Sequence, residues 1–325
     1  MKKNLFRTLL LATAALAGCE TATDLPEPPH TPRVALMHIL TTAPLDSSFY
    51  ELFQQRRLYV SNSQRVFDTN YLTGRPDATV ELRDATGSVV ERYRAARGTQ
   101  YGNYPGYYLP VLGFRPQPGQ QYTLRASLPG LETAESTLTM PAAPVVESGS
   151  YEPRSVPGPN GSGQYTGRLN LALRDDPNAT NYYLAFARLL DRQGQSSNGN
   201  SSLRVDYNSQ NSAVSIGQFQ LSSPSQGYSI YPFADANVNG QRISLASDVQ
   251  FYNYCSQPGC PQPGFIEVTV SSITKDAYDF YLSRRRYYDA DGNPFAEPAP
   301  LASNVRPGYG LFGGATDVTY VIQLP

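Results

Sequence analysis

Short runs of β-branched and aromatic residues, often alternating with polar ones, recur along most of the chain. A period of two places successive side chains on opposite faces of a β-strand, and the Gly, Pro, Asn and Asp residues between the runs favour turns. The first half contains predicted strands at 33–41, 58–61, 78–83, 88–93, 107–111, 122–127 and 132–139. So many short strands in about 110 residues are typical of an immunoglobulin-like β-sandwich, which we expect over residues 33–141.

The second half continues the strand pattern after a segment rich in Pro, Gly and Ser. That segment, residues 142–164, is predicted to be a linker. Residues 168–176 then alternate leucine with polar residues, and residues 181–194 are predicted to be the partner strand across a turn at 176–180. Further strands are predicted at 218–221, 241–245, 265–273 and 316–324, with a polar loop over 193–211.

One helix is predicted in the second half, at about 275–288. Its apolar face is formed by Ala277, Tyr278, Tyr281, Leu282 and Tyr288, which recur at helical spacing. Thr274 can cap the helix, and three arginines at 284–286 lie near its C-terminal end, where cations suit the helix dipole. The sequence therefore predicts an all-β chain whose second β-rich domain, residues 165–325, carries one helix.

The first 32 residues lack any strand pattern. Residues 1–18 combine a basic start with a short apolar run, as a secretory signal peptide does, and the run is shorter than the roughly 20 residues that span a bilayer. Leu16-Ala17-Gly18-Cys19 has the form at which a signal peptide is cleaved before a cysteine that carries lipid. We therefore expect lipidation of Cys19, the alternative being an incidental cysteine. Residues 19–32, acidic and proline-rich, are predicted to be an extended spacer.

The two remaining cysteines, Cys255 and Cys260, lie close together in a segment rich in Pro and Gly. An exported chain meets oxidising conditions, so a disulfide between them is the favoured interpretation. Metal binding is the weaker alternative, because two thiols without a nearby histidine do not complete a tetrahedral site. The formal net charge of the chain is −1, which gives no basic footprint for nucleic acid.

Candidate catalytic residues are few in this sequence. The two histidines, His30 in the spacer and His38 in the first strand, are not expected to organise a site. Asp175 and Asp176 could be paired carboxylates, but neighbours on a strand point to opposite faces, so a role in the turn is favoured. Residues 289–293, DADGN, resemble a calcium loop whose glycine comes two positions too early, and the end of the helix is favoured there. We therefore assign no catalytic residue, metal ligand or cofactor.

Tyrosine and glycine give the chain its candidate binding surfaces. The 24 tyrosines, with no tryptophan, include a tyrosine-rich loop at 100–108 that can bind a glycan, a peptide or a protein, or that can simply be half-buried. Residues 306–314, RPGYGLFGG, offer Tyr309 and Phe312 as apolar anchors for a partner. The alternative is that these glycines permit bulges or close backbone packing in a strand.

Four stretches, in order, resemble the Bacteroidota lipoprotein family called domain of unknown function 4249 (DUF4249). GCETATDLP is similar to its lipidated start, and PDATVELRDATG, PGQQYTLRASLPG and TMP are similar to its N-terminal sandwich. LRDDPNATNYYLAFAR resembles the start of its second domain, and YLSRRRYYDADGNPFAEPAPLASNVRPGYGLFGG resembles its C-terminal signature. The resemblance implies an accessory component beside a TonB-dependent outer-membrane receptor. It supplies no catalytic residues.

The expected function is therefore that of a lipid-anchored outer-membrane binding protein without catalytic activity, working with a TonB-dependent receptor in nutrient uptake. We expect it on the cell surface rather than on the periplasmic face, since acidic residues follow Cys19. Two alternatives stay open: a polysaccharide or peptide hydrolase, and an adhesive or structural envelope protein with no transport partner.

Overall fold

The computed structural model describes most of the chain from residue 27 onward. The described residues are 27–43, 56–65, 68, 70, 72–96, 105–155, 163–195, 203–205, 212–213, 217–222, 229–253, 261–290 and 299–325. The chain divides into two compact units, one of Met1–Thr31 with Gln64–Asn70 and one of Pro32–Ser63 with Tyr71–Pro325. Every strand and helix named below belongs to the second unit.

Strands make up nearly all the regular structure of the described residues. The strands of the first half are β1 (Val34–Thr41), β2 (Leu58–Asn62), β3 (Thr79–Asp84), β4 (Val89–Ala95), β5 (Tyr107–Pro110), β6 (Gln121–Ser127), β7 (Ala134–Thr139) and β8 (Val145–Ser155). Those of the second half are β9 (Gly163–Arg174), β10 (Tyr182–Asp191), β11 (Leu203–Val205), β12 (Ser212–Ala213), β13 (Gly217–Gln218), β14 (Phe233–Ala234), β15 (Arg242–Asn253), β16 (Pro263–Ile273) and β17 (Gly308–Gln323). The helix α3 (Lys275–Ala290) follows β16. The predicted all-β fold class is confirmed.

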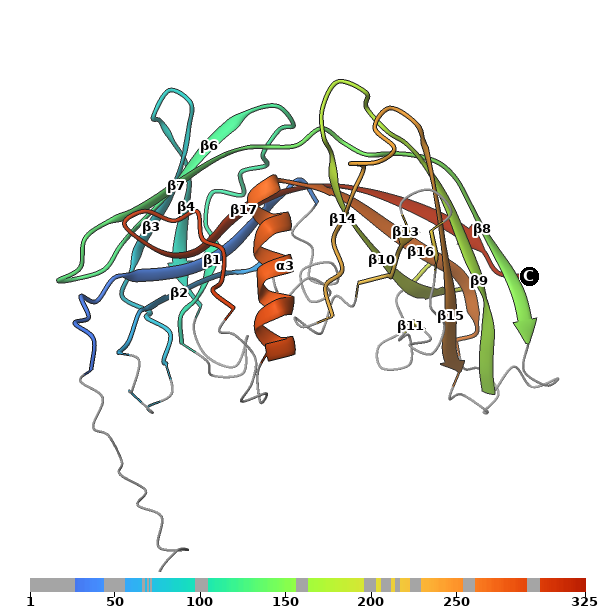
Figure 1. Ribbon diagram of the computed structural model, residues 1–325, viewed down its shortest axis with the longest axis horizontal. Helices are drawn as coiled ribbons and strands as arrows, with labels where there is room; N and C mark the ends of the chain where they lie inside the picture. The colour runs from blue at the N-terminus through green and yellow to red at the C-terminus, as the bar shows by residue number, and fades with distance from the viewer. Residues whose placement is uncertain are drawn as a thin grey trace, which may run out of the picture. The chain divides into compact units, whose positions relative to one another are not determined.

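One mixed sheet of eleven strands organises the molecule, in the order β14-β10-β16-β17-β1-β2-β5-β4-β3-β6-β7. The strands β1 and β17 are parallel, with Val34 opposite Gly308 and Thr41 opposite Ala315. Figure 1 shows the red β17 beside the blue β1, so the last strand pairs with the first. The other strands form a four-stranded sheet, β11-β15-β9-β8, and the pair β12-β13. Strands from both expected domains thus share one sheet, and the ranges of the two domains stay a prediction.

Buried side chains gather in three clusters. The first fills the strands of the N-terminal half, with Phe312 of β17 among its members. The second lies where the four-stranded sheet faces β10 and β16, and it includes Leu171 and Ala185. In the third, α3 packs on the large sheet, with Phe280 against the cluster that holds Leu184. The strand β10 contributes to both the second and the third clusters, so it is buried on both faces, and this explains its nearly continuous apolar sequence.

The predicted strands of the first half are confirmed to within two residues at each end. The predicted linker at 142–164 is wrong, because β8 and the start of β9 lie inside it and pair antiparallel. β8 is an edge strand with mostly exposed side chains and two irregularities in its register. An edge strand tolerates Pro, Gly and Ser, so its composition resembles that of a linker.

The predicted pairing across the turn at 176–180 is also wrong. β9 pairs with β15 and β8, whereas β10 pairs with β16 and β14 in the large sheet. The turn therefore joins two sheets that share a core instead of closing a hairpin. Leucines on one face suit β9, which is covered on one side, while β10 needs cover on both sides.

The predicted helix is confirmed as α3, with a shifted buried face. Ala277 and Tyr281 are buried as expected, but Phe280 joins them and Tyr288 is exposed. The Thr274 hydroxyl accepts a hydrogen bond from the amide of Gly314, which fixes the start of α3 to β17. The contact with the large sheet therefore decides which face of α3 is buried.

Several expectations fall on residues outside the described part of the chain. They concern the signal peptide at 1–18, the lipidation of Cys19, most of the spacer at 19–32, and the disulfide between Cys255 and Cys260. No helix among the described residues has both the length and the apolar character needed to cross a bilayer.

Candidate functional site

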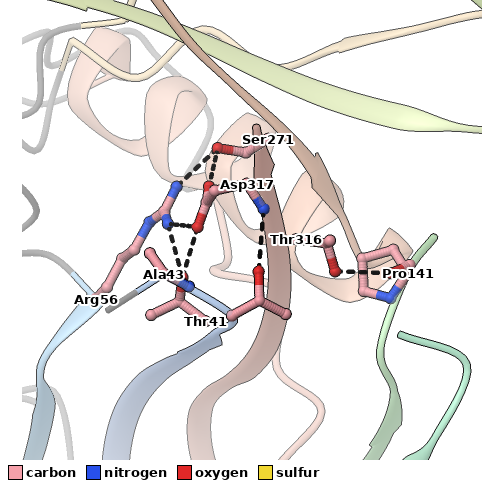
Figure 2. Close-up of polar contacts among 8 residues, drawn as sticks. Thr41, Ala43, Arg56, Pro141, Ser271, Thr316 and Asp317 are labelled. Carbon is pink, nitrogen blue, oxygen red and sulfur yellow. Dashed lines mark hydrogen bonds and ion pairs between the residues drawn. The ribbon is translucent and has the colours of Figure 1, made fainter. Parts of the chain in front are cut away.

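A buried polar cluster joins four strands near the middle of the large sheet. Thr41 ends β1, Arg56 precedes β2, Ser271 lies in β16 and Asp317 lies in β17. Figure 2 shows the Arg56 guanidinium pointing at the Asp317 carboxylate, with Nη1 2.7 Å from Oδ2. Arg56 Nη2 donates to Ser271 Oγ at 2.8 Å, and the hydroxyls of Ser271 and Thr41 donate to Asp317. The cluster connects residues more than 200 positions apart in sequence.

Asp317 stays ionised inside the protein because of these contacts. Its side chain and that of Arg56 are only 4% and 7% exposed. Burial opposes ionisation, but the charge of Arg56 and the hydrogen bonds from Arg56, Ser271 and Thr41 outweigh it, so the pKa of Asp317 is lowered. A carboxylate with a lowered pKa is a weak base, and Ser271 donates its proton to that carboxylate. The arrangement suits a structural lock between strands better than an activated nucleophile.

His38 lies beside this cluster as a buried, neutral side chain. Its Nδ1 donates to the Arg56 carbonyl oxygen at 2.9 Å, so Nε2 accepts from the Tyr93 hydroxyl at 3.2 Å. Its ring stacks on that of Phe312. Burial lowers the pKa of His38 to about 4, although the bond to Arg56 opposes this. Both ring nitrogens are engaged in hydrogen bonds within the fold.

Two acidic residues meet at the turn between β9 and β10. Asp175 accepts from the Tyr183 hydroxyl at 2.7 Å and from the Gly240 amide at 2.8 Å. Asp235 accepts from the Asn181 amide at 2.9 Å. Burial raises the pKa of Asp235, and the neighbouring carboxyl of Asp175 raises it further, against the donors of Asn181. Burial, followed by the hydrogen bond to Asp175, also raises the pKa of Tyr183.

A third buried acid, Glu91 of β4, holds the loop that follows β5. Its carboxylate accepts the backbone amides of Val111, Leu112 and Phe114 at 2.6–2.9 Å, as well as that of Arg92. Burial opposes ionisation, but these four amides outweigh it and the pKa of Glu91 is lowered. The loop presents Val111 and Leu112 with 53% and 55% of their surface exposed. This is an apolar surface feature on a fixed backbone, and it is our candidate binding surface.

The residues predicted as partner anchors behave differently from each other. Tyr309 is 50% exposed, and its role in binding a partner stays a prediction. The interpretation of Phe312 as an anchor is wrong, because its side chain is fully buried in the core. Successive residues of a strand alternate between faces, and positions 309 and 312 differ by an odd number, so they point to opposite sides. The alternative interpretation, that 306–314 forms a strand with close backbone packing, is confirmed over 308–314.

Sequence reasoning found the turn role of Asp176 but missed the partner of Asp175. Asp176 Oδ1 accepts the Asn178 amide at 3.0 Å, as a turn residue does. Asp175 pairs in space with Asp235, about which the strand pattern says nothing. Residues 235–240, D-A-N-V-N-G, nevertheless match the first positions of the calcium-loop pattern D-x-[DN]-x-[DN]-G, and this match could have pointed to Asp235. The described residues contain no group of three or more His, Cys, Asp or Glu side chains suited to a metal ion.

Comparison with known proteins places the chain in a family and gives little more. The sequence matches the family described as "Domain of unknown function (DUF4249)" over residues 46–320. No curated protein matches it. Among solved structures, "Biofilm associated protein - BSP domain" is similar at 6% identity and a TM-score of 0.16, over 89% of this chain and 58% of that one. The chain thus spans less than two thirds of that protein, and so low a TM-score carries no argument about fold or function.

Proposed function

Because this chain belongs to the DUF4249 family, we propose that it is a lipid-anchored accessory protein of the outer membrane that binds a protein partner and catalyses no reaction. The proposed partner is a TonB-dependent receptor, with nutrient uptake as the shared task and the cell surface as the location. The lipid would be attached to Cys19, following the LAGC sequence. Two or more acyl chains would hold the protein stably at the membrane.

The observation that carries the binding role is the exposed pair Val111 and Leu112 on the loop held by Glu91. Exposed apolar side chains gain free energy when a partner removes them from water, about 25 cal/mol per Å². A loop whose backbone is already fixed by three hydrogen bonds to Glu91 loses little entropy when it binds. A buried carboxylate that holds an exposed apolar loop in one conformation is what we expect of a loop that binds a protein partner.

The polar residues support binding rather than catalysis. The carboxylate of Asp317 is neutralised by Arg56, and the ring nitrogens of His38 are both engaged in hydrogen bonds. These groups contribute to folding in their present arrangement, and each would have to break its contacts before it could transfer a proton.

A comparison of two leucine variants tests the proposal. Leu112→Asp places a charge on the candidate surface, and Leu301→Asp places one on another exposed loop leucine, 47% exposed. Each variant and the wild type would be affinity-purified from detergent-solubilised membranes, after thermal melting has verified that both variants fold. We expect a large β-barrel receptor with the wild type and with Leu301→Asp, and much less with Leu112→Asp. Equal recovery from all three, or no barrel with the wild type, would contradict the proposal.

A further inference from the structure

The carboxylates of Asp175 and Asp235 form a buried, negatively charged site without a cationic partner among the described residues. Asp175 is 4% exposed and Asp235 is fully buried. The donors around them are neutral: the Tyr183 hydroxyl, the backbone amides of Asn181 and Gly240, and the Asn181 side-chain amide. Asp235 Oδ1 is buried and accepts no hydrogen bond from a donor group in the described part of the chain. The two carboxyl groups interact directly. Two interacting carboxylates do not both stay ionised in a buried site unless a positive charge lies between or beside them.

Oxygen atoms outnumber hydrogen-bond donors at this site. The side-chain nitrogen of Asn181 lies 3.0–3.4 Å from four oxygens: Asp175 Oδ1, Asp235 Oδ2 and the carbonyl oxygens of Asp176 and Ala179. A primary amide has only two N–H groups, so it cannot satisfy four acceptors. An excess of carboxylate and carbonyl oxygens is the ligand chemistry of calcium.

The chain that follows Asp235 has the pattern with which many calcium loops begin. Residues 235–240, D-A-N-V-N-G, place an acid first, amides third and fifth, and glycine sixth. Gly240 has a φ of +75°, and a Cβ there would lie 2.7 Å from the Cβ of Pro177. The twelfth position, an acid in an EF-hand, is Ala246 here. Asp175, which accepts the Gly240 amide, supplies a carboxylate from the neighbouring strand end instead.

We propose that Asp175 and Asp235, with oxygen atoms of the 235–241 turn, bind a calcium ion. The site has oxygen ligands and no histidine or cysteine among the residues named, which disfavours zinc, and its irregular turn suits calcium better than the octahedral geometry of magnesium. The ion would tie the end of β9, in the four-stranded sheet, to the start of β10 and to β14 in the large sheet. Calcium would thus stabilise the contact between the two sheets.

Calcium-dependent melting of the detergent-solubilised full chain tests this inference. After treatment with EDTA, we expect 5 mM Ca²⁺ to raise the Tm by several degrees, an equal concentration of Mg²⁺ to have a much smaller effect, and EGTA to reverse the shift. Asp235→Asn should abolish the shift. The matched control is Asp84→Asn, since Asp84 also caps a turn, accepting the amides of Thr86 and Ser88, and should keep the shift.

Terbium luminescence provides a second readout, because it reports an ion at the site whether or not that ion changes the melting temperature. Tyr183 donates to Asp175 at 2.7 Å, so it lies close enough to sensitise a bound Tb³⁺ ion. We expect emission that Ca²⁺ displaces, and a several-fold loss of that emission in Tyr183→Phe. A wild type whose melting ignores Ca²⁺ and whose Tb³⁺ emission Ca²⁺ does not displace would overturn the inference, and would indicate a proton shared by the two acids. That result would leave the proposed partner binding unaffected, since the two sites share no residue.

Discussion

At the scale of single residues, buried carboxylates make the polar contacts that are hardest to predict from the sequence. Glu91 and Asp317 occupy strand positions that polar residues normally present to solvent, yet both are buried. Alternation alone cannot identify them, because it does not say which face of a strand is covered. Their partners are backbone amides, one arginine and two hydroxyl groups, and no short sequence motif encodes either arrangement. The strands were predictable, and the polar contacts within them were not.

Replacing Glu91 with Gln should destabilise the protein by about 2–3 kcal/mol at pH 7, because an amide NH₂ would face a backbone donor that the carboxylate now accepts. The lowered pKa of Glu91 means that its contribution is complete above its ordinary value of 4.5 and declines as the pH falls through the lowered one. Urea denaturation at pH 7 and pH 3 measures this. The gap between wild type and variant should shrink at pH 3.

The exposed Glu132 provides the control for this experiment. Glu132→Gln should change the free energy of unfolding by less than about 0.5 kcal/mol at either pH. If Glu91→Gln behaved in the same way, the hydrogen bonds to the loop would not be holding it.

His38 predicts a second pH dependence with its own window. Its pKa is about 4 in the folded protein and 6.5 in an ordinary peptide, so the unfolded chain takes up the proton first as the pH falls. The contribution of neutral His38 to the free energy of unfolding is therefore fully present above pH 6.5, and it should fall by up to about 3 kcal/mol between pH 6.5 and 4. In His38→Gln, the urea midpoints at pH 7 and pH 5 should differ less than they do in the wild type. An unchanged difference would show that the imidazole is not kept neutral by burial.

At the scale of elements, the parallel pair of β1 and β17 depends on a glycine. Gly310 has a φ of +113°, and a Cβ there would lie 1.8 Å from the carbonyl oxygen of Leu36 in β1. Gly310→Ala should therefore cost more than about 3 kcal/mol or prevent folding. Gly119→Ala is the matched control, since Gly119 has a φ of +77° with nothing within 4 Å.

The control should cost about 1–2 kcal/mol, the strain of a left-handed residue alone. Thermal melting of both variants measures the difference. Equal losses would mean that β1 and β17 can separate at this point without consequence.

The cluster around Arg56 and Asp317 is a second contact that holds neighbouring strands together. Asp317→Asn removes the carboxylate that pairs with the buried Arg56 and should destabilise the protein by about 3–5 kcal/mol. The double variant Arg56→Met/Asp317→Leu should recover most of that loss, since apolar residues of similar size avoid the cost of burying charge. A double-mutant cycle of Arg56→Met, Asp317→Leu and the double variant, measured by urea denaturation, gives the coupling free energy. Additive effects would contradict the structural lock.

Prediction from sequence succeeded for elements whose burial is simple and failed where it is not. The strands β1 to β7 have alternation or short apolar runs between clear turns, and their positions were predicted correctly. The strand β8 was missed because an exposed edge needs no apolar pattern. The partner of β9 was assigned wrongly because local turn chemistry cannot distinguish a hairpin from a connection between sheets.

At the scale of the whole molecule, the chain closes on itself. β17 lies between β16 and β1 in the large sheet, so the last strand pairs with both the first strand and the strand before the helix. Pairing at such a separation in sequence is slow to form, because a long loop must close first. The sequence suggested two separate halves because pattern analysis detects local strands and contains no information about which distant strands will pair.

The tether on Cys19 is the central claim about function, because it decides where the protein works and which partners it can meet. Mass spectrometry of the N-terminal peptide, from protein purified out of its own membranes, tests it directly. We predict a chain that begins at Cys19 and carries diacylglycerol on the sulfur, and a Cys19→Ser variant that leaves the membrane fraction. A peptide with a free Cys19 thiol, or a chain that retains residues 1–18, would contradict the account.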